Sequence, residues 1–134
     1  MRIYRALFLI NRSLRYERHT IKGKKTAETL GDKALFVKHD VSKRDQWEHV
    51  VKTTEDKFGP IQILVNNAGI VIQKPMEEQT DEFFHRTYDI NQFGVYLGML
   101  CVYDSMKKVG KGSIINVSST SGFRGKAGLM GSNA

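Results

Sequence analysis

The stretch Ile61-Gln62-Ile63-Leu64-Val65, which runs directly into Asn66-Asn67-Ala68-Gly69, decides the fold of this chain of 134 residues. A short apolar run bounded by turn-forming residues is typical of a strand buried in a sheet. Helical patterns lie on both sides of it. Strands that alternate with helices of about ten residues or more form parallel sheets through right-handed crossovers, so the sequence predicts an α/β fold.

The helix before this strand has the clearest pattern in the chain. Ser42, with Asp45 three residues later, predicts an N-cap of the capping-box type, and Gly59-Pro60 predicts the end. Its apolar face consists of Trp47, Val50, Val51, Thr54 and Phe58. We therefore expect Trp47 to pack in the core.

Further helices and strands are predicted along the chain. A helix over 22–30 is expected to stop at Gly31, and residues 81–108 form a long helical stretch. Residues 6–10 form a short apolar run that predicts another strand. We expect parallel strands at about residues 34–39, 61–66 and 113–117, with the last two adjacent.

Charge and cysteine content narrow the class of protein. The chain carries 21 Lys and Arg against 14 Asp and Glu, and eight of these cations but only two of the acids lie in residues 1–30. The remainder is near neutral, so nucleic acid is not expected as a partner. No apolar run approaches the ~20 residues of a membrane helix. The lone Cys101 excludes a disulfide framework and indicates a reducing, cytoplasmic setting.

The basic N-terminal residues allow a second interpretation. Residues 11–26 are polar and cationic with weak periodicity, and residues 11–20 are expected to be poorly ordered because their cations have few apolar partners. An Arg-rich composition near a terminus is also typical of a transit peptide. Glu17 and the weak amphipathicity count against that alternative.

Polar or small residues follow three of the predicted strands. They are Asp40, the segment Asn66 to Gly69, and Ser118-Ser119. Each alone is typical of a turn or a helix cap. In an open parallel sheet, however, ligands bind beyond the carboxyl ends of the strands. Three such ends in a row indicate a cleft for a dinucleotide.

The order of these motifs resembles the short-chain dehydrogenase/reductase family. Asp40-Val41 comes first, then Asn66-Asn67-Ala68-Gly69, then Asn91 within residues 90–94, and then the run 112–119. The resemblance covers about Lys22 to Ala134 and is closest to bacterial alcohol dehydrogenases and 3-oxoacyl-carrier-protein reductases. It implies part of a Rossmann-like, doubly wound parallel sheet in a three-layer α/β/α arrangement. Residues 21–134 would form a partial dinucleotide-binding domain, after a basic segment at 1–20 with room for one strand.

The resemblance also implies a chemistry and a role for each matching residue. Such enzymes transfer a hydride between NAD(P)(H) and an alcohol or carbonyl substrate. Asp40 and Val41 would contact the adenine. Asn91 would hold a water of the proton relay, and Ser119 would bind the substrate oxygen. The cofactor side of the sheet would be formed by Asn66, Ala68 and Gly69.

Two parts of the family pattern are absent from the sequence. Ser132 stands at the position of the family's proton-donating Tyr, and the Lys four residues beyond has no counterpart. No Gly precedes Gly23, so a Gly-rich phosphate-binding turn is missing. We therefore expect weak cofactor binding and a catalytically incomplete chain, truncated at both ends. If residues 6–10 are the family's second strand, Arg12 would lie near a ribose 2′-phosphate and favour NADP over NAD.

A second Tyr-x-x-x-Lys match occurs at Tyr103 and Lys107, before the Ser119 strand. A pair at this spacing near the end of a helix is typical of a surface contact, and we interpret it so. The chain offers no ligand spacing for a metal, and none is expected. The histidines concerned are His19, His39, His49 and His85.

The family's topology has consequences for exposed surfaces. Its first strand lies in the middle of the sheet, so either residues 6–10 take that place or apolar strand edges stay unpaired. The helix that pairs with residues 81–108 in the family's dimer is also missing. We therefore expect exposure of Tyr96, Leu97, Leu100 and Tyr103. A second copy of the chain could cover this face and form a homo-oligomer. The alternatives to an oxidoreductase are a non-catalytic remnant that pairs through this face and a pseudogene product without a role.

Overall fold

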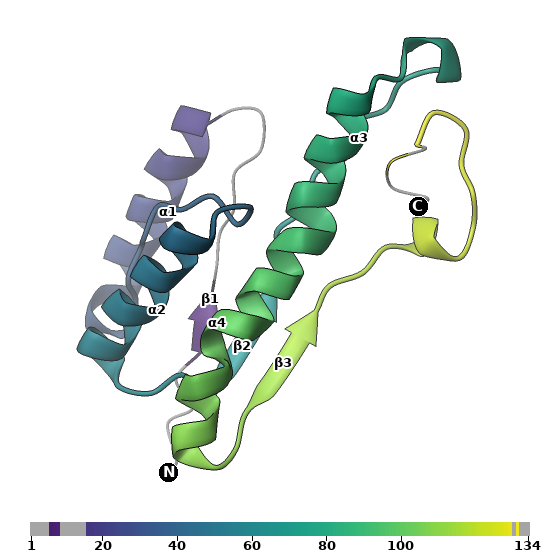
Figure 1. Ribbon diagram of the computed structural model, residues 1–134. Coiled ribbons are helices and arrows are strands. Elements are labelled where there is room, and N and C mark those ends of the chain that lie inside the picture. Colours follow the sequence, from purple (N-terminus) through teal and green to yellow (C-terminus); the bar gives the residue numbers. More distant parts are fainter. Residues whose placement is uncertain (1–5, 9–15, 130, 132–134) are drawn as a thin grey trace.

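The computed structural model describes residues 6–8, 16–129 and 131 (Figure 1). Its sheet has three parallel strands in the order β1 (Ala6–Phe8), β2 (Ile63–Asn66) and β3 (Ser113–Asn116). The strands predicted at 61–66 and 113–117 are confirmed, and so is their adjacency. The α/β class is confirmed as well.

The central strand shows why this sequence folds here. Residues alternate between the two faces of a strand, and in β2 Leu64 and Asn66 are buried while their neighbours are half-buried. The register pairs Leu64 with Ile114 and Asn66 with Asn116, and it pairs Ala6 of β1 with Ile63. Residues 6–8 thus occupy the place beside β2, which was one of the two outcomes expected.

Two helices cover one face of the sheet. α2 (Arg44–Phe58) packs against α4 (Gly94–Val109), and α4 contacts β2 (Figure 1). α1 (Tyr16–Leu30) lies further back in the same view. The buried core joins these elements and consists of Val41, Trp47, Val50, Ile61, Leu64, Ile70, Ile90, Leu97 and Val102. Trp47 is 1% exposed, so its predicted core position is confirmed.

The long helical stretch predicted at 81–108 is confirmed with a local change of geometry. It comprises α3 (Asp81–Tyr88), a π-helical turn at Asp89–Phe93 and α4. Thr80 caps its start by accepting a hydrogen bond of 3.3 Å from the amide of Phe83. π-Helical turns inside helices occur frequently at functional sites, and this one contains Asn91. Short 3-10 turns occupy Gly31–Lys33, Met76–Glu78 and Thr120–Gly122.

The prediction of a strand at residues 34–39 is wrong, because the structure has no strand there. Strand backbone needs a neighbouring strand to pair its N–H and C=O groups, and none of the three paired strands, β1, β2 and β3, pairs with this segment. The segment instead packs through its side chains. Val37 packs against the core, and a Cβ on Gly23 of α1 would lie only 2.3 Å from the Phe36 ring. Phe36 and Val37 are half-buried and Leu35 is exposed, so the segment is only partly buried and is not paired.

Two helix starts differ from the predictions. α1 begins at Tyr16, before the predicted Lys22, because residues 16–22 contain no Gly or Pro and several good helix formers. Its described residues 16–20 are helical, and residues 11–15 lie outside the described part. At α2, Lys43 takes the N-cap position without a side-chain cap, and the Ser42 hydroxyl instead donates to Asp40. The predicted capping box is therefore wrong.

The side chains of α4 that were expected to be exposed are exposed, with one exception. Tyr96, Leu100 and Tyr103 of α4 are 49%, 44% and 60% exposed, whereas Leu97 is fully buried. Leu97 faces the core because it lies on the same side of α4 as the buried residues Gly94, Gly98 and Val102. On β3 both faces are open, since Ile114 and Ile115 are exposed alike.

Candidate nucleotide site

The first segment of the site is a turn built around Asp40. The Asp40 Oδ1 atom accepts hydrogen bonds from the Ser42 amide, at 3.0 Å, and from the Ser42 hydroxyl, at 2.8 Å. The Asp40 amide donates to Oε1 of Gln46 at 2.6 Å. An Asp side chain that bonds the backbone two residues later forms an Asx turn. This turn fixes Asp40 at the entrance to α2.

The second segment follows β2. Asn66 is 5% exposed, and its Nδ2 donates to Oδ1 of Asn116 at 2.9 Å and to the Val95 carbonyl at 3.4 Å. One side chain thereby links the ends of β2 and β3 to α4. Ala68 is half-buried and Gly69 is exposed as the chain turns away from the sheet.

The π-helical turn is joined to this second segment through Asn91. Its Oδ1 accepts from the Ile70 amide at 2.8 Å, and its Nδ2 donates to the Ile70 carbonyl at 2.9 Å. A Cβ on Gly69 would lie 3.5 Å from the same Oδ1, which is an ordinary contact. The structure therefore brings Asn91 and the residues after β2 together.

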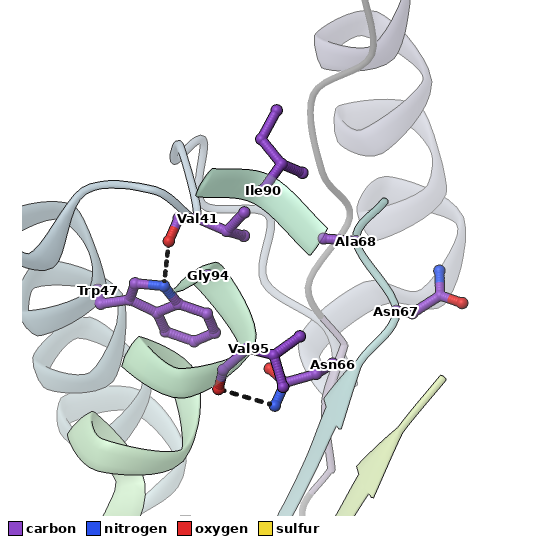
Figure 2. A pocket seen from close by; sticks show the side chains of 8 residues that line it. All are labelled: Val41, Trp47, Asn66, Asn67, Ala68, Ile90, Gly94 and Val95. Carbon is purple, nitrogen blue, oxygen red and sulfur yellow. Dashed lines mark hydrogen bonds between the residues drawn. The ribbon is translucent and has the colours of Figure 1, made fainter. Parts of the chain in front are cut away.

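Two hollows adjoin these segments. A small cavity of about 10 Å³ is lined by Val41, Trp47, Asn66, Asn67, Ala68, Ile90, Gly94 and Val95 (Figure 2). A larger, more open hollow of about 290 Å³ is lined by Asp40, Ser42, Lys43, Glu82, His85, Arg86, Asp89 and Ile90. Ile90 lines both, so the hollow at the Asp40 turn and the cavity at the segment after β2 are neighbours.

The larger hollow carries a mixed set of charges. Its lining combines the carboxylates of Asp40, Glu82 and Asp89 with basic groups on Lys43 and Arg86. The Nε atom of Arg86 is buried and has no hydrogen-bond partner among the described residues. An open cleft of this size with several hydrogen-bonding groups can receive a polar, flat ligand of a few rings.

Ser119 stands apart from the contacts that join the other segments. It lies after β3, and its hydroxyl accepts a hydrogen bond of 3.2 Å from the Ser121 amide at the start of the turn Thr120–Gly122 (Figure 1). Within the described part of the chain it therefore acts as a cap. Arg12 and Ser132 lie outside the described residues.

The second Tyr-x-x-x-Lys match is a surface pair. The Lys107 Nζ lies over the Tyr103 ring, 5.8 Å from its centroid, and Tyr103 is 60% exposed. This is a cation-π contact between residues one helical turn apart. No described group of three or more His, Cys, Asp and Glu side chains could hold a metal ion. No described helix is long and apolar enough to cross a membrane.

His39 is a residue near the site that the sequence interpretation missed. It is 6% exposed, neither ring nitrogen has a hydrogen-bond partner among the described residues, and its ring is edge-on to Trp47 at 4.8 Å. Burial lowers the pKa of His39 from 6.5 to about 4, against the opposing effect of the Asp40 carboxylate. The only signal in the sequence was its place at the end of an apolar run, directly before Asp40.

Comparisons with known proteins agree with this geometry. The family model for short chain dehydrogenases matches residues 9–131. The chain is 41% identical over 120 residues to the NADP-dependent (R)-specific alcohol dehydrogenase of Lentilactobacillus kefiri, covering 87% of this chain and 48% of that protein. It is 40% identical over 113 residues to a 3-alpha-(or 20-beta)-hydroxysteroid dehydrogenase of Mycobacterium bovis, covering 84% and 44%.

Solved structures give the same result. The structure of ElxO with NADP bound superposes with a TM-score of 0.74 at 28% identity, over 83% of this chain and 47% of that one. The serine dehydrogenase from Escherichia coli superposes with a TM-score of 0.76 at 27% identity, over 88% and 54%. The chain thus spans about half the length of the relatives it matches. With a family match over most of its residues, the chain belongs to the short-chain dehydrogenase family.

Proposed function

We propose that the chain forms the nucleotide-binding part of an oxidoreductase that transfers a hydride between NAD(P)(H) and a small alcohol or carbonyl compound. The observation that carries this proposal is the side-chain bonding between strand-end segments. The Asn91 side chain bonds both the amide and the carbonyl of Ile70. The residue before Asn91, Ile90, lines the larger hollow together with Asp40. On this proposal residues 21–134 are a partial dinucleotide-binding domain, preceded by a basic segment at residues 1–20.

The residues present fit the adenosine end of such a cofactor. Asp40 and Ser42 of the Asx turn line the larger hollow, Val41 and Ala68 line the small cavity, and Gly69 is exposed where the chain leaves β2. NADP is favoured over NAD because relatives named for NADP match the chain and because Arg12 would carry positive charge toward a 2′-phosphate. Weak binding is proposed because no Gly precedes Gly23 to form a phosphate turn.

The remaining roles concern the substrate. The bound cofactor would supply or accept the hydride. Ser119 would donate a hydrogen bond from its hydroxyl to a substrate oxygen, and Asn91 would hold a water through its main chain, since Ile70 occupies its side-chain amide. Ser132 is a far weaker acid than a Tyr of pKa about 10, so the chain as printed would lack an effective proton donor.

Nucleotide titration tests the proposal. NADPH binding to the isotope-labelled chain should shift the amide resonances of residues 40–43 and 66–70, with a dissociation constant in the millimolar range, or about −4 kcal/mol. NADH should bind more weakly. Shifts confined to the basic residues 16–25 would indicate charge attraction alone and overturn the proposed site. Micromolar affinity would show that another part of the chain replaces the missing phosphate turn.

Turnover tests the catalytic part of the proposal. The 134-residue chain should not oxidise NADPH with a panel of simple ketones, and Ser132→Tyr alone should not restore activity, because no Gly among residues 1–22 can form a phosphate turn. The control variant is Tyr103→Phe. If the unmodified chain turns over and Tyr103→Phe does not, the Tyr103 and Lys107 pair is the acid and our interpretation of it is wrong.

The second candidate function is non-catalytic pairing. The exposed side chains of Tyr96, Leu100 and Tyr103 on α4 favour it, since aromatic residues are enriched where proteins associate. Sedimentation velocity over a hundredfold range of concentration would detect self-association, and Leu100→Lys should abolish it. A constant sedimentation coefficient would exclude pairing with a second copy.

A further inference from the structure

Trp47 makes a hydrogen bond that a purely apolar core residue would not need. It is 1% exposed, and its indole Nε1 donates to the Val41 carbonyl at 2.8 Å (Figure 2). Val41 itself is 2% exposed. A buried carbonyl that lost this donor would be left unsatisfied, so the bond constrains where the Val41 backbone can lie.

Two glycines of α4 hold the pair from the opposite side. A Cβ on Gly94 would lie 2.8 Å from Cγ2 of Val41, and a Cβ on Gly98 would lie 2.8 Å from Cη2 of Trp47. The α4 backbone therefore approaches both residues closely. Because protein interiors transmit displacement rather than absorb it, the indole has little freedom to move away from the Val41 carbonyl.

The bond lies directly beneath the Asp40 turn. The Asp40 carbonyl accepts from the Lys43 amide at 3.0 Å, and the Trp47 amide donates to the Lys43 carbonyl at 3.2 Å. The Val41 carbonyl is part of the peptide between Val41 and Ser42, so this bond holds the peptide that carries the Ser42 amide bonded to Asp40. The turn is thereby attached to α2 through a side chain as well as through its backbone.

We propose that Trp47 is a positioning residue, whose indole N–H sets the place of the Asp40–Val41 turn and so the adenosine end of the nucleotide site. The expected effect of Trp47 on nucleotide affinity rests on the proposed function. The positioning itself can be measured without any nucleotide. The chain has a single Trp, so a tryptophan analogue replaces Trp47 alone.

The first measurement is hydrogen exchange in the free chain. Trp47→Phe keeps an aromatic ring and removes the N–H. We expect exchange of the Ser42 amide, which bonds Asp40, to accelerate about tenfold relative to the amides of β2. Val102→Ala, which removes core volume at a fully buried site on α4, is the control and should accelerate both sets equally.

The second measurement is binding of adenosine 5′-monophosphate by chemical-shift titration. Trp47→Phe should weaken binding about fivefold or more, and Val102→Ala should change it less than twofold. Replacement of Trp47 by 5-fluorotryptophan, which keeps the N–H, should restore both the exchange ratio and the affinity.

The outcomes separate the two proposals. Equal acceleration in Trp47→Phe and Val102→Ala would overturn the positioning role, because Trp47 would then stabilise the whole fold only. A selective change in exchange without any change in affinity would overturn its link to the nucleotide site. If the unmodified chain binds no nucleotide, the proposed function fails, and the exchange ratio still decides whether Trp47 positions the turn.

Discussion

The hydroxyl oxygen of Ser105 accepts a hydrogen bond of 2.6 Å from the backbone amide of Ile61. Both residues are buried, at 3% and 2% exposure. The bond ties α4 to the chain just before β2. Ser105 lies between Tyr103 and Lys107, so the buried residue of that catalytic-looking motif has a structural role.

Ser105→Ala should destabilise the chain. Without the hydroxyl oxygen the Ile61 amide remains buried and unsatisfied, which costs about 1–3 kcal/mol. Urea denaturation followed by circular dichroism should show a lower midpoint with an unchanged slope. Ser113→Ala, at an exposed position of β3, is the control and should change the midpoint little. Equal effects of the two substitutions would contradict the role of the bond.

His39 should make the chain sensitive to mild acid. Its pKa is lowered by burial from 6.5 to about 4, so between these values the unfolded chain binds a proton that the folded chain does not. Stability is therefore lost as pH falls from about 6.5 to about 4, by roughly 3 kcal/mol in total. Denaturation midpoints at several pH values measure the loss.

The matched variants for this prediction are His39→Leu and His49→Gln. His39→Leu should remove most of the slope in that pH window, because no titrating ring remains in the core. His49 is exposed on α2, so His49→Gln should retain the slope. A slope that persists in His39→Leu would assign the acid sensitivity to other groups.

Gly98→Ala should disturb the contact between α4 and the site. The added Cβ would lie 2.5 Å from Oδ1 of Asn66 and 2.8 Å from the Trp47 ring, and both side chains are held by hydrogen bonds. Overpacking costs about 1–3 kcal/mol, and the better helix propensity of Ala recovers about 1 kcal/mol at most. We expect lower stability together with a change in the near-ultraviolet dichroism of Trp47.

The control for this packing prediction is Gly125→Ala. A Cβ there meets no atom within 4 Å, and its backbone is not strained. Its spectrum and midpoint should match those of the unmodified chain. An unchanged Trp47 signal in Gly98→Ala would mean that α4 can move away from Trp47 at little cost.

The sequence was sufficient where local pattern and burial coincide. The apolar run before Asn66 needed no partner information to be identified as a strand, and the helical face of Trp47 and Val50 is buried as its spacing predicts. The sequence was insufficient where pairing with a neighbouring strand decides whether a segment forms a strand. Residues 34–39 also contain an apolar run, yet no described strand pairs with them.

The candidate site shows the same division. The resemblance proposes Asp40, Asn66 and Asn91 as site residues, but it could not show which side chains hold one another. The Ser42 hydroxyl donates to Asp40 and does not cap α2, because α2 begins at Arg44 and so places Lys43 at the N-cap position. The burial of His39 also depends on Trp47, which lies eight positions further along the chain, and no local pattern reports such a contact.

Asn91 offers a test of the link between the π-helical turn and the segment after β2. Its side chain uses both its acceptor and its donor on the two backbone groups of Ile70. Asn91→Asp keeps the acceptor and replaces the donor by a carboxylate oxygen that faces the Ile70 carbonyl. At pH 7 this should cost about 1–3 kcal/mol, because a donor is lost and two acceptors approach each other.

Protonation of the new carboxyl would restore a donor, so folding should raise its pKa. A group whose pKa is raised in the folded state stabilises the fold at low pH and loses that contribution as pH rises. The difference in unfolding free energy between Asn91→Asp and the unmodified chain should therefore shrink as pH falls from 7 toward 4, measured by urea denaturation at each pH. Asn91→Ala, which loses both bonds, should show a constant difference, and Asn67→Asp, at an exposed position, should show little difference at any pH. A pH-independent penalty in Asn91→Asp would mean that the donor bond to the Ile70 carbonyl does not hold the two segments together.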